Sequence, residues 1–534
     1  MSHENQADND RYDAIIVGAG MGGLTTAAFL AVEGQKVLVL EKHDKPGGYL
    51  TSFSRGGYRF DAGLFHLNEL GPDETISQFM RYWGEEVPAQ RVEYQFRWFL
   101  GEREFHLDSR EIEQSFGASF PAEQATIRRF FDLCHTMLQE IRRMGPPKPP
   151  YDMSLAEKLA FGVRSLIAMP TFLRFGRKDG VRVLRRLCRD QALASLLFGY
   201  YPVPGLIFQG HAWGWEAIKE GRNYYPVGGM QKIPDAVVRA IERHGGRVLL
   251  GTEARRIVVE GGQAKSVECT DGRQFVADVV VSNASLHHTL DVLLEDVPGL
   301  ERLRKTVMRR KIFPSAMLVF LGMAEGYDFG GINHLLLLDN RALELRQEDL
   351  TPDNCPVALV VPPKPEGQAG HSALVVAFLP YEYRDCWATG GSGVRGERYR
   401  SLKAEVENIL LGRIGRRLGS GFREAIRLLI AATPLTLERY THSTRGSFMG
   451  WSMDERSTGH FIPQRSPITN LYLVGQWVFP AAGVPGVMAG GYYLAREILQ
   501  REGINLEGKL TARLQVGQDR DERPGEAPPG ERVK

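Results

Sequence analysis

The chain contains 534 residues, of which 43% are hydrophobic and 24% charged, so it can bury a large core. Lys and Arg number 66 against 64 Asp and Glu, so no overall charge favours nucleic acid, and we expect no such partner. The five cysteines are scattered and never form C-x-x-C, which argues against a disulfide framework or a zinc site. We therefore expect no metal and a reducing, cytoplasmic location.

The first predicted elements form a strand, turn, helix and strand. Residues 14–17 are an apolar run of strand type, 24–32 have helical composition, and 36–40 form a second strand-type run. Gly34 follows the helix as a C-cap. This order predicts a β-α-β unit within about 30 residues.

Glycines fill the turn of this unit in the pattern G-x-G-x-x-G, through Gly18, Gly20, Gly22 and Gly23. The first glycine permits the tight turn, the second lets the backbone approach a pyrophosphate, and the last lets the helix pack closely on the sheet. The helix N-terminus offers free N–H groups to that anion. This context predicts a dinucleotide site, and a chance glycine-rich turn is the alternative.

Two charged residues follow the second strand. Glu41 stands 18 residues after Gly23, close to the spacing of an acid that binds ribose hydroxyls. Lys42 comes next and suggests contact with a nucleotide 2′-phosphate, although we favour a solvated surface lysine.

The middle of the chain, residues 78–222, is predicted to be mainly helical. Nine Lys or Arg and one acid lie between Lys158 and Arg189, interleaved with apolar residues, and a largely apolar stretch continues to Phe208. Mixed basic and apolar residues at helical spacing suit a helix on anionic lipid, so residues 158–208 are predicted to contact a membrane surface. A solvated basic face on a core helix is the alternative.

The second half returns to α/β character. Residues 234–244 are predicted as a helix, followed by strands at 247–250, 254–259, 266–269, 274–276 and 278–282 that form a small antiparallel meander before rejoining the main sheet. A mixed region at about 290–461 precedes a strand at 471–474 and a helix near 487–499. The uncharged run 471–495 contains glycines and prolines, so we predict a strand, turn and helix there instead of a membrane span.

Together these patterns predict an α/β fold in which a discontinuous, Rossmann-type nucleotide-binding domain accompanies a mixed substrate domain. The nucleotide domain would comprise residues 12–80, 224–290 and 462–505. The substrate and membrane-associating domain would comprise 81–223 and 291–461. The polar tail 506–534 is predicted to be disordered because it has too little apolar surface to bury.

Glycines continue past the first unit, at Pro46-Gly47-Gly48 and in FDAG at 60–63, which favours FAD over NAD. Here the sequence resembles the flavin amine oxidoreductase superfamily, and within it the phytoene desaturase, carotenoid isomerase and retinol saturase group. The matching stretches lie at 15–48, 58–63, 224–248, 433–440 and 471–491, so the resemblance spans nearly the whole chain, with little in 81–222.

The resemblance implies roles for several residues. Glu41 would hold the adenosine ribose, and Gly47 and Gly48 would lie near the pyrophosphate. The backbone of Ala254, where the family usually has valine, would read adenine. Gly475 would approach the ribityl-phosphate region.

At the flavin end, Gln476 stands where many relatives carry an acid. Backbone N–H groups at the start of the last helix would stabilise negative charge on reduced flavin, and they belong to Gly483, Val484, Gly486, Val487 and Met488.

The implied activity is flavin redox chemistry at C–C bonds of a long apolar isoprenoid, by a desaturase, saturase or isomerase of the kind found in carotenoid biosynthesis. Tyr49 stands where desaturases often have arginine, which favours the latter two slightly. His66, after FDAG, is the best-placed acid/base candidate, although we favour a structural histidine. The alternatives are an amine oxidase acting on small amines and a non-catalytic polyprenyl-binding protein of the GDP-dissociation-inhibitor type.

Overall fold

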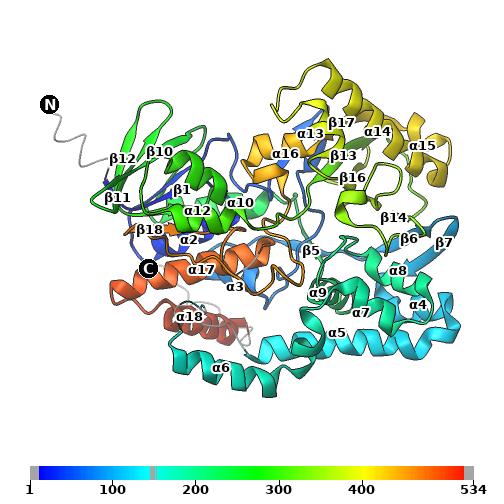
Figure 1. The fold of residues 1–534 in the computed structure, drawn as a ribbon, viewed down its shortest axis with the longest axis horizontal. Helices are drawn as coiled ribbons and strands as arrows, with labels where there is room; N and C mark the ends of the chain where they lie inside the picture. Colours follow the sequence, from blue (N-terminus) through cyan, green and yellow to red (C-terminus); the bar gives the residue numbers. More distant parts are fainter. Residues whose placement is uncertain (1–10, 145–148, 150, 152, 481, 522–534) are drawn as a thin grey trace, which may run out of the picture.

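The computed structural model describes residues 11–144, 149, 151, 153–480 and 482–521, and it contains two seven-stranded sheets. The sheets lie towards opposite ends of the long axis (Figure 1). A group of helices, coloured cyan and green-blue, runs along the edge between them. The predicted fold class, a Rossmann-type α/β unit with a mixed second part, is confirmed.

The first sheet has the order β10-β11-β12-β1-β2-β9, and β18 also pairs with β12. Its parallel strands come from distant segments: β1 (Arg11–Val17), β2 (Val37–Leu40), β9 (Arg247–Leu249), β12 (Gln274–Ser282) and β18 (Leu471–Leu473). The hairpin β10 (Ala254–Glu260) and β11 (Gln263–Cys269) adds antiparallel edge strands. The meander is thus as predicted, except that its last two strands are one.

Both faces of this sheet are buried, as parallel sheets require. Ala14 and Ile16 of β1 pack with α2 (Met21–Val32), whereas Ile15 and Val17 pack with the hairpin on the opposite face. Helices α10 (Lys232–Arg243) and α17 (Val484–Arg501) lie against α2. The alternation of side chains along a strand therefore explains why the whole run is apolar.

The second sheet has the order β17-β13-β16-β15-β14-β6-β7. Its strands are β6 (Gln95–Leu100), β7 (Arg103–Asp108), β13 (Ala316–Met323), β14 (His334–Leu338), β15 (Val357–Val360), β16 (Ser372–Phe378) and β17 (Ile426–Ala432). Helix α14 (Glu397–Leu418) covers one face through Val406, Leu410 and Ile414. The segment 78–222 is mainly helical, as predicted, but it also contains the strands β6 and β7. Strand β6 pairs with β14, which is distant in sequence, and β7 pairs with β6.

The helical part contains α4 (Ile112–Ser119), α5 (Gln124–Met144), α6 (Leu155–Ala168), α7 (Gly180–Leu187), α8 (Gln191–Gly199) and α9 (Phe208–Lys219). Every residue of α8 after Gln191 is buried, so this part of the predicted membrane-contacting stretch lies in the core. Helix α6 is different, because most of its residues are exposed. Its capping box joins Ser154 and Glu157.

Shorter elements connect these parts. The strands are β3 (Ser52–Arg55), β4 (Tyr58–Asp61), β5 (Ala89–Arg91) and β8 (Tyr224–Pro226). The helices are α3 (Thr75–Tyr82), α11 (Leu286–His288), α12 (Glu301–Met308), α13 (Tyr383–Ala388), α15 (Gly421–Glu424) and α16 (Pro434–Thr441). Single 3-10 or π turns occupy Ser109–Glu111, Pro121–Glu123, Phe172–Gly176, Thr289–Leu293, Gln347–Asp349 and Thr444–Gly446.

The uncharged run at 471–495 forms β18, a turn and the first part of α17, as predicted. Within the described ranges, no helix has the length and apolar character needed to cross a membrane.

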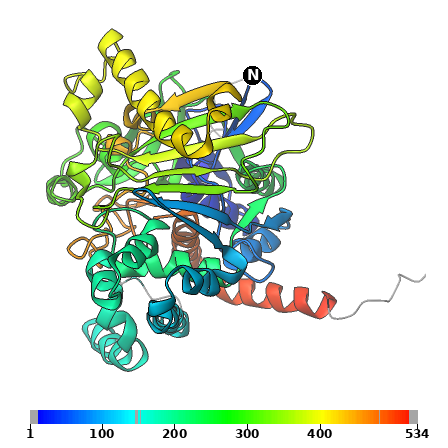
Figure 2. The same ribbon diagram turned by 90° about the vertical axis from the view of Figure 1, so that its right-hand side faces the viewer.

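The C-terminal segment contradicts the predicted disorder at 506–521, because these residues form helix α18 (Leu506–Asp521). Leu506 is buried, Lys509 forms an ion pair with Glu33, and the Arg513 guanidinium lies over the ring of Tyr82. Figure 2 shows α18 extending away from the body. A few anchoring contacts at its first turns thus order a helix of polar composition, while residues 522–534 lie outside the described part.

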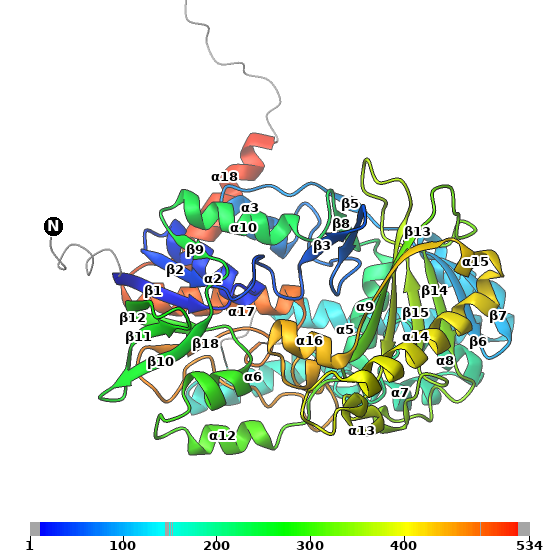
Figure 3. The same cartoon turned by 90° about the horizontal axis from the view of Figure 1, so that it is seen from above.

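The strands of the two sheets come from different stretches of the chain. Those of the first sheet lie within 11–40, 247–282 and 471–473, and those of the second within 95–108, 316–378 and 426–432. We propose that the sheets mark two domains with the boundaries given by the sequence analysis. Viewed from above, the two sheets and the helices between them make an elongated molecule (Figure 3).

Candidate functional site

The loop between β1 and α2 is built from glycines that have no room for a side chain. Gly18 has φ +98°, a conformation that L side chains rarely adopt. A Cβ at Gly23 would lie 2.6 Å from the Gly18 carbonyl oxygen and 2.9 Å from Ile16 Cγ2. The loop can therefore turn tightly, and α2 can lie directly on the sheet.

Helix α2 begins at this loop without a side-chain cap. Gly20 is its N-cap residue, and its φ of −71° and ψ of 163° are extended. The first N–H groups of the helix therefore remain available to an anion at its positive end. Gly47 donates its N–H to the Ala19 carbonyl at 2.8 Å, and a Cβ at Gly48 would lie 3.4 Å from Gly20 Cα. The predicted second glycine pair thus lies against the first loop.

Glu41 also reaches this loop. Its Oε2 accepts the Ala19 N–H at 2.7 Å, and its Oε1 accepts the His43 N–H at 2.9 Å, so the buried carboxylate fixes the loop to the end of β2. The Glu41 carbonyl accepts the Thr252 N–H at 2.7 Å, which brings the start of β10 at Ala254 to the same edge.

Lys42 is half-buried, in contrast to the solvated lysine that we favoured. Its ammonium donates to the Arg439 carbonyl at 3.1 Å. Burial lowers the pKa of Lys42 to about 8, although Glu253 and Glu41 oppose this shift. The side chain therefore links β2 to α16.

Asn283 is a central residue that the sequence analysis missed. Its Nδ2 donates to the Gly18 carbonyl at 3.1 Å, and a Cβ at Gly20 would lie 2.7 Å from that nitrogen. Asn283 directly follows β12, which pairs in parallel with β1. The available signal was its place after a predicted strand, since ligands gather at the carboxyl ends of parallel strands.

The C-terminal residues complete this edge. Gly475 follows β18 with φ +102°, and a Cβ at Gly22 would lie 3.1 Å from Gly475 Cα. Gln476 donates its side-chain N–H to the Ser443 hydroxyl at 3.2 Å. The structure thus brings the loops from the beginning and end of the chain together.

The last helix begins in the same manner as α2. Gly483 has φ +83° and forms the N-cap of α17 without a side-chain hydrogen bond. The predicted residues of its first turn follow directly, and they are Val484, Gly486, Val487 and Met488. A Cβ at Gly491 would lie 2.6 Å from the Gly22 carbonyl oxygen, so the two helices touch backbone to backbone.

His66 lies in a buried aromatic cluster. Its Nδ1 is 2.8 Å from the Tyr94 hydroxyl, and its Nε2 is 3.4 Å from the Tyr200 hydroxyl. Burial lowers the pKa of His66 to about 4, so the imidazole is neutral at pH 7. The ring of His334 packs edge-on against Tyr94 and accepts the Trp98 N–H at 3.1 Å. No sequence spacing joins these residues, which come from four separate segments of the chain.

The site chemistry fits a dinucleotide. Two helix N-termini without side-chain caps, glycines that leave no room for Cβ atoms, and a buried acid at the end of the second strand meet at one sheet edge. A comparison with protein-family models matches residues 21–328 to the flavin containing amine oxidoreductase family, over more than half of the chain. The chain belongs to this family.

Relatives of known activity are similar over nearly the whole chain. All-trans-retinol 13,14-reductase of Danio rerio is 27% identical, over 95% of this chain and 89% of its own. Prolycopene isomerase 1 of an Oncidium hybrid cultivar is 26% identical, over 93% of this chain and 85% of its own.

Among solved structures, wild-type putrescine oxidase bound to putrescine has a TM-score of 0.61 and 15% identity, and the match covers 92% of this chain and 99% of that one. This likeness concerns the fold. Family membership makes the chain an FAD-dependent oxidoreductase of the flavin containing amine oxidoreductase family, as the resemblance implied.

Proposed function

We propose that this oxidoreductase acts on C–C bonds of a long apolar isoprenoid polyene. The observation that carries the proposal is the end-to-end similarity to proteins named for a retinol reductase and a prolycopene isomerase activity. Both substrates are conjugated isoprenoids, and both reactions change C–C double bonds. The same similarity favours a polyene over a small amine.

An apolar cluster beside the site supports such a substrate. Phe448 packs on Tyr49 with ring centroids 5.4 Å apart, and a Cβ at Gly63 would lie 3.3 Å from its ring. Two residues further on, a Cβ at Gly450 would lie 2.5 Å from the Gln476 carbonyl oxygen. From Phe448 the cluster continues through Tyr201, Val203, Leu206, Phe313, Phe378, Met449 and Met453. Apolar side chains thus extend from the proposed flavin end towards the second sheet.

The geometry supports the roles that we propose for residues at the cofactor. Bound FAD supplies hydride exchange with a substrate carbon. The N-terminus of α2 and Gly47–Gly48 would face its pyrophosphate, and Glu41 would hold its ribose. The start of α17 at Gly483 would place backbone N–H groups at the flavin end.

We assign to His66 the positioning of Tyr94 and Tyr200. A neutral imidazole with one donor and one acceptor nitrogen can join two hydroxyls and pass a proton between them without acquiring lasting charge. In this role His66 does not act as an ionised acid, which agrees with its lowered pKa.

Polyene turnover tests the proposed function directly. FAD-loaded protein, reduced under anaerobic conditions, is mixed with all-trans-retinol or with prolycopene in detergent micelles. We expect either loss of one conjugated double bond or an altered cis/trans ratio, each visible by chromatography with absorbance detection. Unchanged polyenes together with hydrogen peroxide released from putrescine in air would instead establish an amine oxidase.

Membrane contact is the second part of the proposal, and the structure narrows the segment that supports it. Helix α6 exposes an apolar stripe at i, i+4 and i+8 spacing, made of Leu155, Leu159, Val163, Leu166 and Ile167. Lys158 and Arg164 lie on the same helix, and Arg174, Arg177 and Lys178 follow it. Such a helix would insert its apolar side at the lipid interface, where a polyene dissolved in the bilayer is collected.

Replacing Ile167, whose side chain is 77% exposed, by aspartate should weaken binding to liposomes containing anionic lipid by about tenfold. The reason is that the substitution removes buried contact with lipid and adds a repelled charge. Co-sedimentation measures the effect.

Val394→Asp is the matched control, because Val394 is 71% exposed and lies in the loop before α14, outside the α6 stripe. We expect it to sediment like the wild type. Equal sedimentation of all three proteins would refute membrane contact through α6.

A further inference from the structure

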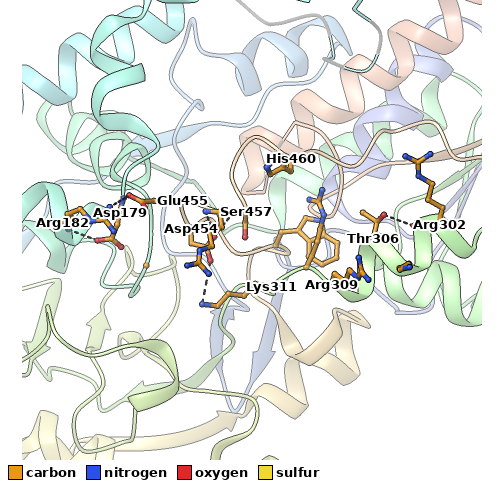
Figure 4. A pocket seen from close by; sticks show the side chains of 15 residues that line it. Asp179, Arg182, Arg302, Thr306, Arg309, Lys311, Asp454, Glu455, Ser457 and His460 are labelled. Atoms are coloured by element: carbon orange, nitrogen blue, oxygen red, sulfur yellow. Dashed lines mark hydrogen bonds and ion pairs between the residues drawn. The ribbon is translucent and has the colours of Figure 1, made fainter. Parts of the chain in front are cut away.

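A basic pocket lies beside the site just described. Its volume is about 940 Å³. Its walls come from α7, from α12 with the loop that follows it, and from the loop at 451–460. Figure 4 shows side chains from these walls around the cavity. Seven of the lining residues are Lys or Arg: Arg182, Arg302, Lys305, Arg309, Arg310, Lys311 and Arg456.

The three acidic residues of the pocket form hydrogen bonds within the loops and the helix that make its walls. Asp454 accepts the Ser457 N–H at 2.8 Å and the Ser452 hydroxyl at 3.0 Å, which shapes its loop. Glu455 accepts the Asp179 N–H at 2.7 Å and lies 3.2 Å from the Arg182 guanidinium. The Asp179 side chain caps α7 by accepting the Arg182 N–H at 2.8 Å. These carboxylates are therefore committed to the loops and to Arg182.

Most of the cations have no such partner. Lys311 lies 3.9 Å from Asp454. No carboxylate within the described ranges forms an ion pair with any of five others: Arg302, Lys305, Arg309, Arg310 and Arg456. Several unpaired positive charges around one concave space repel each other unless an anion binds there.

Arg310 is the residue of this pocket whose positive charge is disfavoured by burial. It is half-buried, with its guanidinium 5.6 Å from the ring centre of Trp451, and burial holds its pKa below the ordinary value. The Trp451 N–H donates to the Trp477 carbonyl at 2.7 Å, one residue after Gln476. The floor of the pocket is thus joined directly to the loop that carries Gly475 and Gln476.

We propose that this pocket binds the phosphate or diphosphate group of a small organic ligand. Guanidinium and ammonium groups that line one cavity from several elements match the charge of phosphates, and guanidinium groups also match the geometry of their oxygens. Two kinds of ligand carry such a phosphate group: a free nucleotide, such as a reduced nicotinamide dinucleotide, and an anionic lipid, through its headgroup. The concave shape can enclose either group.

The test is a binding measurement that does not depend on turnover. FAD-loaded protein is titrated calorimetrically with inorganic pyrophosphate, with NADPH, and with phosphatidylcholine vesicles with and without phosphatidic acid. Lys305→Glu/Arg309→Glu changes two exposed side chains of the pocket. We expect it to weaken binding of the preferred probe by roughly tenfold or more.

Arg398→Glu/Arg400→Glu is the control, with the same change of net charge on exposed residues of α14. We expect it to bind within about twofold of the wild type. Selective loss of NADPH binding identifies a nucleotide, and selective loss of phosphatidic acid binding identifies a lipid headgroup. Absence of wild-type binding to every probe, or equal losses in both variants, would overturn the proposal. Neither outcome bears on the polyene reaction.

Discussion

Gly23→Ala is expected to weaken flavin binding by about tenfold or more, so that the purified protein carries less flavin than the wild type. The added Cβ would lie 2.6 Å from the Gly18 carbonyl oxygen and 2.9 Å from both Asn283 Cβ and Ile16 Cγ2. Two of these neighbours are fixed by β1 and its turn, so α2 must move away from the sheet. Overpacking of this kind costs about 1–3 kcal/mol, and 1.4 kcal/mol corresponds to a factor of ten in affinity.

The ratio of absorbance at 450 nm to that at 280 nm measures the flavin content. Gly117→Ala is the matched control, because Gly117 lies within α4 and the atom nearest to its added Cβ would be 3.7 Å away. Glu41→Gln is the companion variant if Gly23→Ala fails to fold, since it keeps the shape but weakens the acceptor of the Ala19 N–H. Full flavin content in both site variants would refute the assigned cofactor site.

Acidification from pH 6.5 to 5.5 is expected to destabilise the protein by about 3 kcal/mol. Burial lowers the pKa of His66 to about 4 and the pKa values of His211 and His334 to about 3. An unfolded histidine titrates near 6.5, so between that pH and the folded pKa the unfolded state binds more protons. This part of the stability is therefore present well above pH 6.5 and is lost on acidification, by about 1 kcal/mol for each histidine between pH 6.5 and 5.5.

Calorimetric Tm values at pH 7, 6.5 and 5.5 check this slope, and for a chain of this size about 3 kcal/mol corresponds to roughly 3 °C. His211→Leu should reduce the slope by about one third. It should also stabilise the protein at pH 7, because neither His211 nitrogen has a hydrogen-bond partner within the described ranges. His106→Gln, at an exposed position, is the control. An unchanged slope in His211→Leu would contradict the argument.

Local sequence was sufficient to predict the part of the site that local backbone geometry dictates. The glycines from Gly18 to Gly23 and the acid at Glu41 lie within one β-α-β unit, so their spacing alone indicates their arrangement. Asn283 lies beside them only because β12 pairs with β1, and a single sequence does not reveal that pairing. The cluster around His66 likewise depends on contacts between distant elements.

The same difference between local and long-range contacts explains where the predicted fold differs from the structure. Strands β6 and β7 lie in a mainly helical segment; β6 is stabilised by pairing with β14 far along the chain, and β7 pairs with β6. Helix α18 has polar composition, but the burial of Leu506 and the ion pair of Lys509 with Glu33, at the end of α2, attach it to the body of the protein. Composition predicts the average behaviour of a segment, whereas a few specific contacts decided these two cases.

The contact between α2 and α17 has a consequence for biosynthesis. Gly22 and Gly491 meet backbone to backbone, and β18 pairs with β12, so the cofactor cradle needs residues that the ribosome adds long after the glycine turn. A nascent chain that already carries the entire glycine turn still lacks the contact of α17 with α2. We therefore expect stable flavin binding only after residue 491 has been synthesised, and we expect messages truncated before codon 491 to yield products without the cofactor.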